Sequence, residues 1–145
     1  MLLYNKFTME AIELYNLAKQ NGIPIYHKRM KKRGAVLYCD GEYYIALSNK
    51  IIHSQRQQKE VLAEELAHCL TGTVYQFTWI TSHVGQLNIA KAENKAQKTA
   101  AALLVPLERL KELSYLSVAE IAEELNVSEK TVLTAIEYYQ LKGLL

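Results

Sequence analysis

The pattern of hydrophobic and polar positions begins with a helix. Leu14, Leu17 and Ala18 recur at helical spacing within residues 6–20, so we expect one apolar helix face there. Asn21-Gly22 follows directly and is typical of a helix end.

Three short strands are predicted next, over residues 23–27, 35–39 and 43–47. Asp40-Gly41 lies between the second and the third, and this dipeptide is a strong signal of a two-residue hairpin turn. The connection before the hairpin holds a run of basic residues: Lys28, Arg29, Lys31, Lys32 and Arg33. Such a run is usually a solvated loop, and the alternative is a patch that attracts an acidic partner.

Helices are predicted through most of the remaining chain. Residues 57–70 carry apolar side chains at helical spacing and end at Thr71-Gly72. Residues 73–89 show no clear period, so we expect them to be irregular. A long helix is expected from Ile89 to Leu104, since Pro106 cannot continue it, and two short helices follow.

The composition is that of a globular protein. Half of the 145 residues are hydrophobic, and there are only six Gly and two Pro. No apolar run approaches the roughly 20 residues that cross a bilayer, and Lys6 and Glu10 interrupt the segment where a signal peptide would be apolar. A cytoplasmic location without membrane binding is therefore expected, where Cys39 and Cys69 would be small buried hydrophobes.

The second predicted helix contains a string of residues that can hold a metal ion. Residues four apart on a helix lie on one face, so Glu64 and His68 can reach one point, with Glu65 beside them. This is the geometry of the H-E-x-x-H metallopeptidase helix, except that Glu64 stands in the first ligand position. Such a string also arises without a site, because Glu and Leu are good helix formers.

The next long helix supplies a third candidate ligand. Glu93, Ala96 and Ala100 recur at about one helical turn, and small residues let two helix backbones approach closely. Ala63 and Ala67 do the same on the motif helix. An alanine stripe alone usually means tight packing, but packing does not explain the charged Glu93 at its head.

These two segments together resemble the ImmA/IrrE family of metallo-endopeptidases. The matching parts are Leu-Ala-Glu-Glu-Leu-Ala-His at 62–68 and Glu-x-x-Ala-x-x-x-Ala-x-x-Leu-Leu-Val-Pro at 93–106. The segment 41–47 also looks like a hairpin strand of that family, and the resemblance spans roughly residues 35–140. It implies an α+β fold with a small zincin-like metallopeptidase core, in which the helices accompany the short three-stranded sheet.

The resemblance also implies a role for each motif residue. Glu64, His68 and Glu93 would be the metal ligands, with Zn²⁺ as the expected ion, and Glu65 would be the catalytic base that activates metal-bound water. Glu64 departs from the usual His, although Glu looks like a recurrent variant among phage-associated relatives.

The departure at Glu64 changes the expected chemistry of the ion. Two carboxylates and one imidazole cancel a +2 charge, which weakens the Lewis acid and makes Mn²⁺ more competitive. His83 in the predicted irregular segment is an alternative ligand, although loop histidines are more often free. His27 and His53 match no ligand pattern and are expected to be surface or structural residues.

The last segment outlines a helix-turn-helix. Ser117 and Glu120 form a capping box, Asn126-Val127 makes a turn, and Ser128 begins a helix that ends at Gly143. We expect residues 1–106 to be the metallopeptidase core and 107–145 to be helix-turn-helix-like helices packed on it.

The charge distribution argues against DNA binding by these helices. Residues 1–111 hold 15 basic and 9 acidic residues, a net of +6, whereas residues 112–145 hold 2 and 6, a net of −4. A DNA reader must neutralise phosphates, so a packing or substrate-docking role is expected and direct nucleic-acid binding is not.

Three functions are consistent with these features. The first is a metal-dependent endopeptidase that resembles phage or mobile-element anti-repressor proteases, which would cleave a helix-turn-helix repressor. The second is a non-catalytic protein that binds a repressor with the same scaffold. The third, least favoured by the charges, is a DNA-binding transcription regulator.

Overall fold

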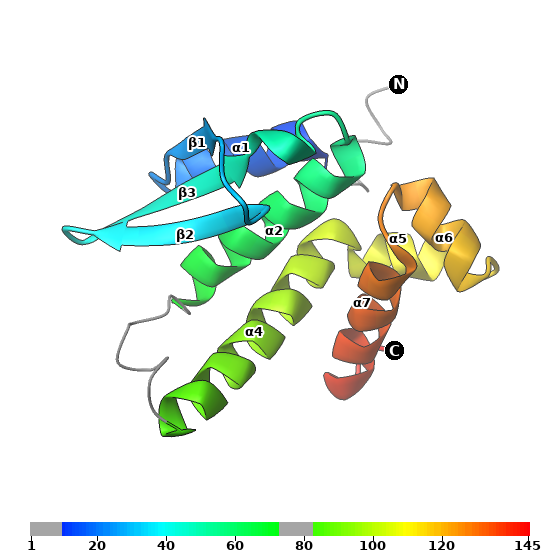
Figure 1. The fold of residues 1–145 in the computed structure, drawn as a ribbon. Coiled ribbons are helices and arrows are strands. Elements are labelled where there is room, and N and C mark those ends of the chain that lie inside the picture. The colour runs from blue at the N-terminus through cyan, green and yellow to red at the C-terminus, as the bar shows by residue number, and fades with distance from the viewer. Residues whose placement is uncertain (1–9, 73–82) are drawn as a thin grey trace.

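The computed structural model describes residues 10–72 and 83–145, with the backbone course alone for 83–89. In these ranges six helices accompany one small mixed sheet, so the fold is α+β, as predicted (Figure 1). The elements in chain order are α1 Ala11–Gln20, β1 Ile25–Lys28, β2 Gly34–Cys39, β3 Glu42–Ser48, a 3₁₀ turn Asn49–Ile51, α2 Gln55–Thr71, α4 His83–Leu104, α5 Leu107–Glu112, α6 Val118–Leu125 and α7 Glu129–Leu141.

The sheet is built around β3, which lies between β1 and β2. β1 pairs with it in parallel and β2 antiparallel, so that Ile45 stands opposite both Ile25 and Val36. Asp40 and Gly41 have φ angles of 52° and 82°, the positive values that a tight hairpin turn requires. The three predicted strands and the hairpin are therefore confirmed, and β2 is left at a sheet edge.

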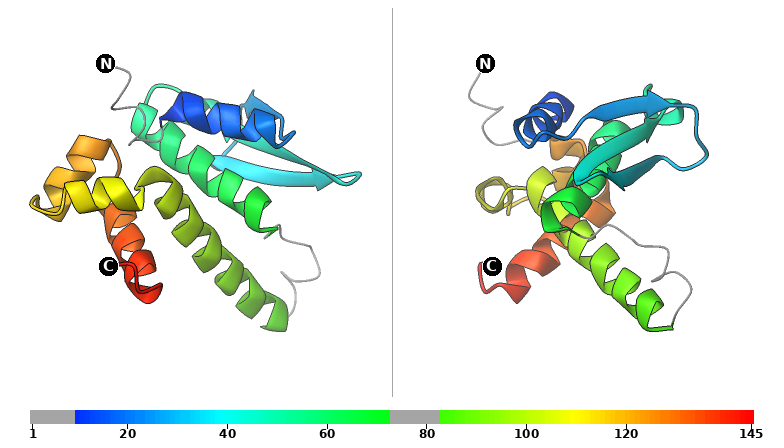
Figure 2. Two further views of the ribbon diagram at one scale, coloured as in Figure 1. Left: turned by 180° about the vertical axis from the view of Figure 1, so that it is seen from behind. Right: turned by 90° about the vertical axis from the view of Figure 1, so that its left-hand side faces the viewer.

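Helix α2 is the central element of the molecule. It packs against β2 and β3 on one side and runs beside α4 on the other, with α1 also against it (Figures 1 and 2). Leu62 and Leu66 are fully buried in the core that this layering creates. The buried Ala96 and Ala100 keep α4 close to α2, as the small-residue stripe predicted.

The C-terminal helices share this core. The predicted capping box of Ser117 and Glu120 is formed, and Asn126 turns the chain with φ 53°. Helix α7 packs on α4, and the Tyr139 hydroxyl donates a hydrogen bond of 2.7 Å to the Val105 carbonyl. Val127 is fully buried.

Two consecutive residues of α2, Lys59 and Glu60, bind the junction between α6 and α7. The Lys59 side chain is 2% exposed, and its ammonium donates to the Leu125 carbonyl at 2.8 Å. Glu60 accepts hydrogen bonds from the Ser128 backbone N–H and the Thr131 hydroxyl, the latter at 2.9 Å. The entry to α7 is thus fixed to the helix that carries the motif.

Several predictions of local structure need correction. Helix α4 begins at His83 instead of Ile89, so the prediction of an irregular segment was wrong for 83–88. Gly85 and Asn88 are weak helix formers, but extending an existing helix costs little. Glu10 is extended and precedes α1, which begins five residues later than predicted; residues 6–9 and 73–82 lie outside the described ranges.

The two cysteines differ from each other. Cys69 is buried, as expected, whereas Cys39 is exposed at the end of edge strand β2 and corrects that prediction. Within the described ranges, no helix is both long and apolar enough to cross a membrane.

Candidate metal centre

The motif lies in the C-terminal half of helix α2, which is capped at both ends. The Ser54 hydroxyl accepts a hydrogen bond from the Gln57 N–H at the start of α2, and Gly72 ends the helix in the left-handed conformation with φ 68°. Glu64, Glu65 and His68 therefore lie two turns or more from the first helical residue, with His68 in the last turn, where the Gly72 N–H closes the helix on the His68 and Cys69 carbonyls.

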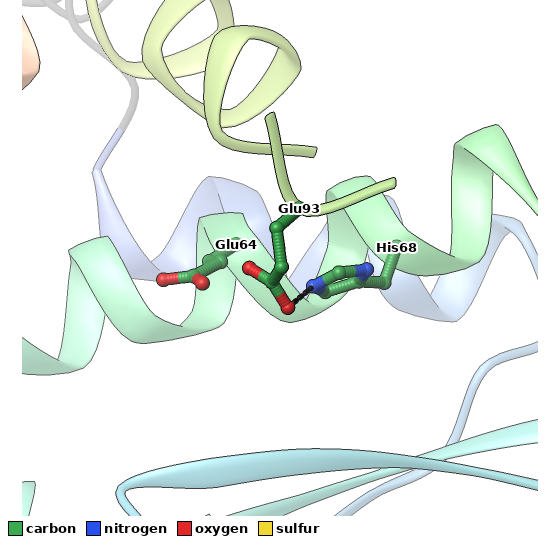
Figure 3. Close-up of side chains that lie close together, drawn as sticks. All are labelled: Glu64, His68 and Glu93. Atoms are coloured by element: carbon green, nitrogen blue, oxygen red, sulfur yellow. Dashed lines mark ion pairs between the residues drawn. The ribbon is translucent and has the colours of Figure 1, made fainter. Parts of the chain in front are cut away.

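The three predicted ligands come together between α2 and α4. One potential ligand atom from each of Glu64, His68 and Glu93 lies within 4.8 Å of the others (Figure 3). The His68 imidazole is 6% exposed, and its Nε2 lies 3.4 Å from Glu93 Oε1. Their roles as ligands remain predictions, but the sequence placed all three correctly in one cluster.

The donor set fits a divalent cation. Two ligands about 2.1 Å from a tetrahedral ion lie about 3.4 Å apart, which is the separation of His68 Nε2 from Glu93 Oε1. Two carboxylates and one imidazole are donors that Zn²⁺ and Mn²⁺ accept. Three protein ligands leave one position open, the arrangement of catalytic sites, whereas structural sites are closed by four.

Glu65 lies on the sheet side of α2, against the first residue of β2. Its side chain approaches the Gly34 backbone so closely that a methyl group there would meet it. Burial raises the pKa of Glu65 to about 7, with the charges of Glu64 and Glu93 adding to the rise and Lys32 opposing it. A carboxylate with a pKa near neutrality is suited to take up and release a proton.

Glu64 is subject to the same forces. Burial raises its pKa, the nearby Glu93 raises it further, and His68 and Lys130 lower it. A divalent cation between these carboxylates would reverse this repulsion, because opposite charge favours the ionised form. The cluster thus concentrates negative charge that a cation would neutralise.

A cavity of about 510 Å³ opens beside Glu64 and Glu65. The sequence did not identify it, because its walls come from four distant parts of the chain. They are Lys32–Gly34, the α2 residues Gln57, Glu60, Val61, Glu64 and Glu65, the α4 residues Gln97, Ala100, Ala101 and Leu104, and Ser128 with the α7 residues Lys130, Thr131 and Thr134. The sequence singled out the basic run, Glu64, Glu65 and Ala100 separately, but gave no signal that they line one cavity.

The remaining histidines do not join the cluster within the described side chains. His27 Nε2 lies 2.8 Å from the Tyr15 hydroxyl, in the interface of α1 and β1. His53 is exposed before α2. His83 is the first residue of α4, and its side chain lies outside the described residues, so its proposed ligand role stays a prediction.

Gly34 offers a test of how closely the strand controls Glu65. A Cβ at this position would lie 2.7 Å from Val61 Cγ1 and 3.1 Å from Glu65 Cγ. We expect Gly34→Ala to cost about 1–3 kcal/mol in unfolding free energy and to displace Glu65. Chemical denaturation measures the first effect, and the NMR signals of the Glu65 side chain report the second. Gly22→Ala cannot serve as the control, because the positive φ of Gly22 would itself strain an alanine. The control is Ala35→Gly, which alters the neighbouring residue of β2 without adding a side-chain atom near Glu65.

A comparison with protein families finds one that covers the site. The family model described as the IrrE N-terminal-like domain, Peptidase M78, matches residues 18–137, a range that includes the three predicted ligands and Glu65. No curated protein sequence matches the chain.

Proposed function

The chain belongs to the IrrE N-terminal-like peptidase family, M78, and on that premise we propose that it is a metal-dependent endopeptidase. The observation that carries the proposal is the convergence of Glu64, His68 and Glu93 beside Glu65. Glu64 of this cluster and the neighbouring Glu65 also line a cavity that a substrate could enter.

The residues divide into ligands and a base. Glu64, His68 and Glu93 would hold the ion, which would polarise the peptide carbonyl and acidify water when bound. Glu65 takes a proton from the attacking water as the oxygen bonds to the carbonyl carbon. The same carboxyl then gives that proton to the amine nitrogen as the peptide bond breaks.

Zn²⁺ is the proposed ion, with Mn²⁺ as a competitor. The carboxylate of Glu64 in place of an imidazole makes the donor set harder and cancels the ion's charge together with Glu93. The site would therefore select zinc less strongly than a site with two imidazoles.

A helix-turn-helix repressor of a phage or mobile element is the proposed substrate. Support for it comes from the resemblance of residues 62–68 and 93–106 to the ImmA/IrrE endopeptidases. The repressor would be the protein partner, bound as a substrate. We place this reaction in the cytoplasm, without membrane attachment.

The fixed position of α7 supports a packing role for the C-terminal helices over DNA recognition. A recognition helix reads bases with its N-terminal residues. Here Ser128 and Thr131 at that end are bonded to Glu60 of α2. Glu129 beside them adds a negative charge, which phosphates would repel.

Elemental analysis combined with a cleavage assay tests the proposal. We expect about one equivalent of metal in the purified protein and less in Glu93→Ala. We also expect the protein to cleave a repressor that is encoded beside its gene, and a chelator to stop this cleavage. Tight repressor binding without metal and without cleavage would instead support a non-catalytic anti-repressor. A chelator-resistant cleavage activity would refute the metal mechanism.

A further inference from the structure

The cavity beside Glu65 extends along α2 away from the His68–Glu93 pair. Its α2 wall runs from Gln57 to Glu65, nine residues whose Cα atoms span about 12 Å of helix. An extended peptide rises about 3.3 Å per residue, so this length holds three to four residues. A peptide cut beside Glu65 could therefore lay the residues next to the cut bond in the cavity.

Positive side chains flank the cavity on two sides. Lys32 and Arg33 come from the connection between β1 and β2, and Lys130 comes from the first turn of α7. All three are exposed, and none forms an ion pair with a carboxylate among the described residues. Lys32 and Lys130 line the same cavity as Glu65 and Glu64, so their charges face the site.

The carboxylates that line the cavity do not neutralise these three positive side chains. Glu60 is bonded to the Ser128 N–H and the Thr131 hydroxyl. Glu64 is a predicted ligand whose charge a divalent ion would cancel. The two negative charges of Glu60 and Glu65 then stand against the three positive charges of the basic side chains. The cavity therefore carries a net positive charge and attracts an anion.

The floor between the charged walls is small and apolar. Val61, Ala100, Ala101 and Leu104 line it, and none of them carries a hydrogen-bonding side chain. Thr131 and Thr134 add hydroxyl groups on the α7 side. Such a surface suits a peptide whose aliphatic atoms lie on the floor while a charged end reaches the rim.

We propose that this cavity is a substrate subsite that selects an acidic side chain within about four residues of the cleaved bond. Lys32 and Lys130 are the specificity-determining residues, one on each side of the bound peptide. This inference rests on the proposed function, since it gives that site its class of substrate. In this proposal, the helix-turn-helix-like segment forms one wall of the subsite.

Labelled peptides of one host sequence provide the test. Dodecapeptides that hold Glu, Gln or Lys at each position in turn are incubated with the zinc-loaded protein, and kcat/KM is measured. We expect the Glu peptides to be cleaved about two- to fivefold faster than their Gln counterparts, an effect typical of solvent-exposed charges. The preference should shrink in 1 M salt, where charges are screened within about 3 Å.

Charge reversal with a matched control identifies the residues responsible. Lys32→Glu and Lys130→Glu should each remove the preference for Glu over Gln, with unchanged thermal stability. Lys31→Glu is the control, since Lys31 lies in the same connection and is exposed but does not line the cavity. Equal cleavage of Glu and Gln peptides by the unaltered protein, or an equal loss in Lys31→Glu, would overturn the subsite.

A binding measurement separates this inference from the proposed function. If no peptide is cleaved, the peptidase proposal fails, and fluorescence anisotropy with the same peptides still decides the subsite. Tighter binding of Glu peptides that Lys130→Glu abolishes would support it. Equal affinity for Glu and Gln peptides would refute it without reference to catalysis.

Discussion

Replacing Glu65 with glutamine is expected to slow peptide cleavage by about two to four orders of magnitude, the usual contribution of a general base. Glutamine has nearly the same shape but cannot accept a proton from water. Its side chain should keep the place of Glu65 against Gly34, and Glu64, His68 and Glu93 are untouched. Single-turnover kinetics with saturating enzyme measure the effect on the chemical step.

The metal content and a second carboxylate variant make this result specific. Glu65→Gln should retain the metal of the unaltered protein, so that a lower rate reports lost proton transfer and not a lost ion. Glu137→Gln, at an exposed position of α7, should leave the rate unchanged. Cleavage at the full rate by metal-loaded Glu65→Gln would show that another group is the base.

Zinc is expected to raise the melting temperature by about 5–10 °C. An ion that binds only the folded protein at 100 times its dissociation constant stabilises by about 2.7 kcal/mol. For a chain of this size, each kcal/mol shifts the melting temperature by about 2–4 °C. The reason is structural, since Glu64 and His68 on α2 and Glu93 on α4 would be joined through one ion.

Differential scanning calorimetry with and without a chelator measures this shift. Glu93→Ala should lose most of it, because one of the three ligands is gone, whereas His53→Ala, before α2, should retain it. A zinc-dependent shift of equal size in Glu93→Ala would place the ion at some other site.

The elements that the sequence predicted well are those whose signals are local. Asp40-Gly41 specifies its turn by its own backbone preference, and the Ser117 capping box satisfies helix N–H groups three residues away. The cluster of Glu64, His68 and Glu93 also followed from local rules, because i, i+4 spacing and the alanine stripe were both visible. The roles of these residues as ligands came from the resemblance to the ImmA/IrrE family and not from local rules.

The features that escaped prediction depend on distant contacts. Nothing near Lys130 in the sequence indicates that it faces the same cavity as Lys32, about a hundred residues earlier. The start of α4 was placed too late because Gly85 and Asn88 lower helix propensity, while the structure continues the helix through them. Cys39 was expected to be buried, as cysteines of cytoplasmic proteins usually are, but it lies at the end of β2, an edge strand of the sheet.

The bond from Lys59 to the Leu125 carbonyl limits how the chain can be shortened. A fragment that stops at residue 106 would lack that carbonyl and leave the ammonium of Lys59 without its acceptor. The same cut would remove Tyr139 from Val105 and Val127 from the core. Truncation at this boundary should therefore yield insoluble protein, and recombinant work on the active centre calls for the chain through α7.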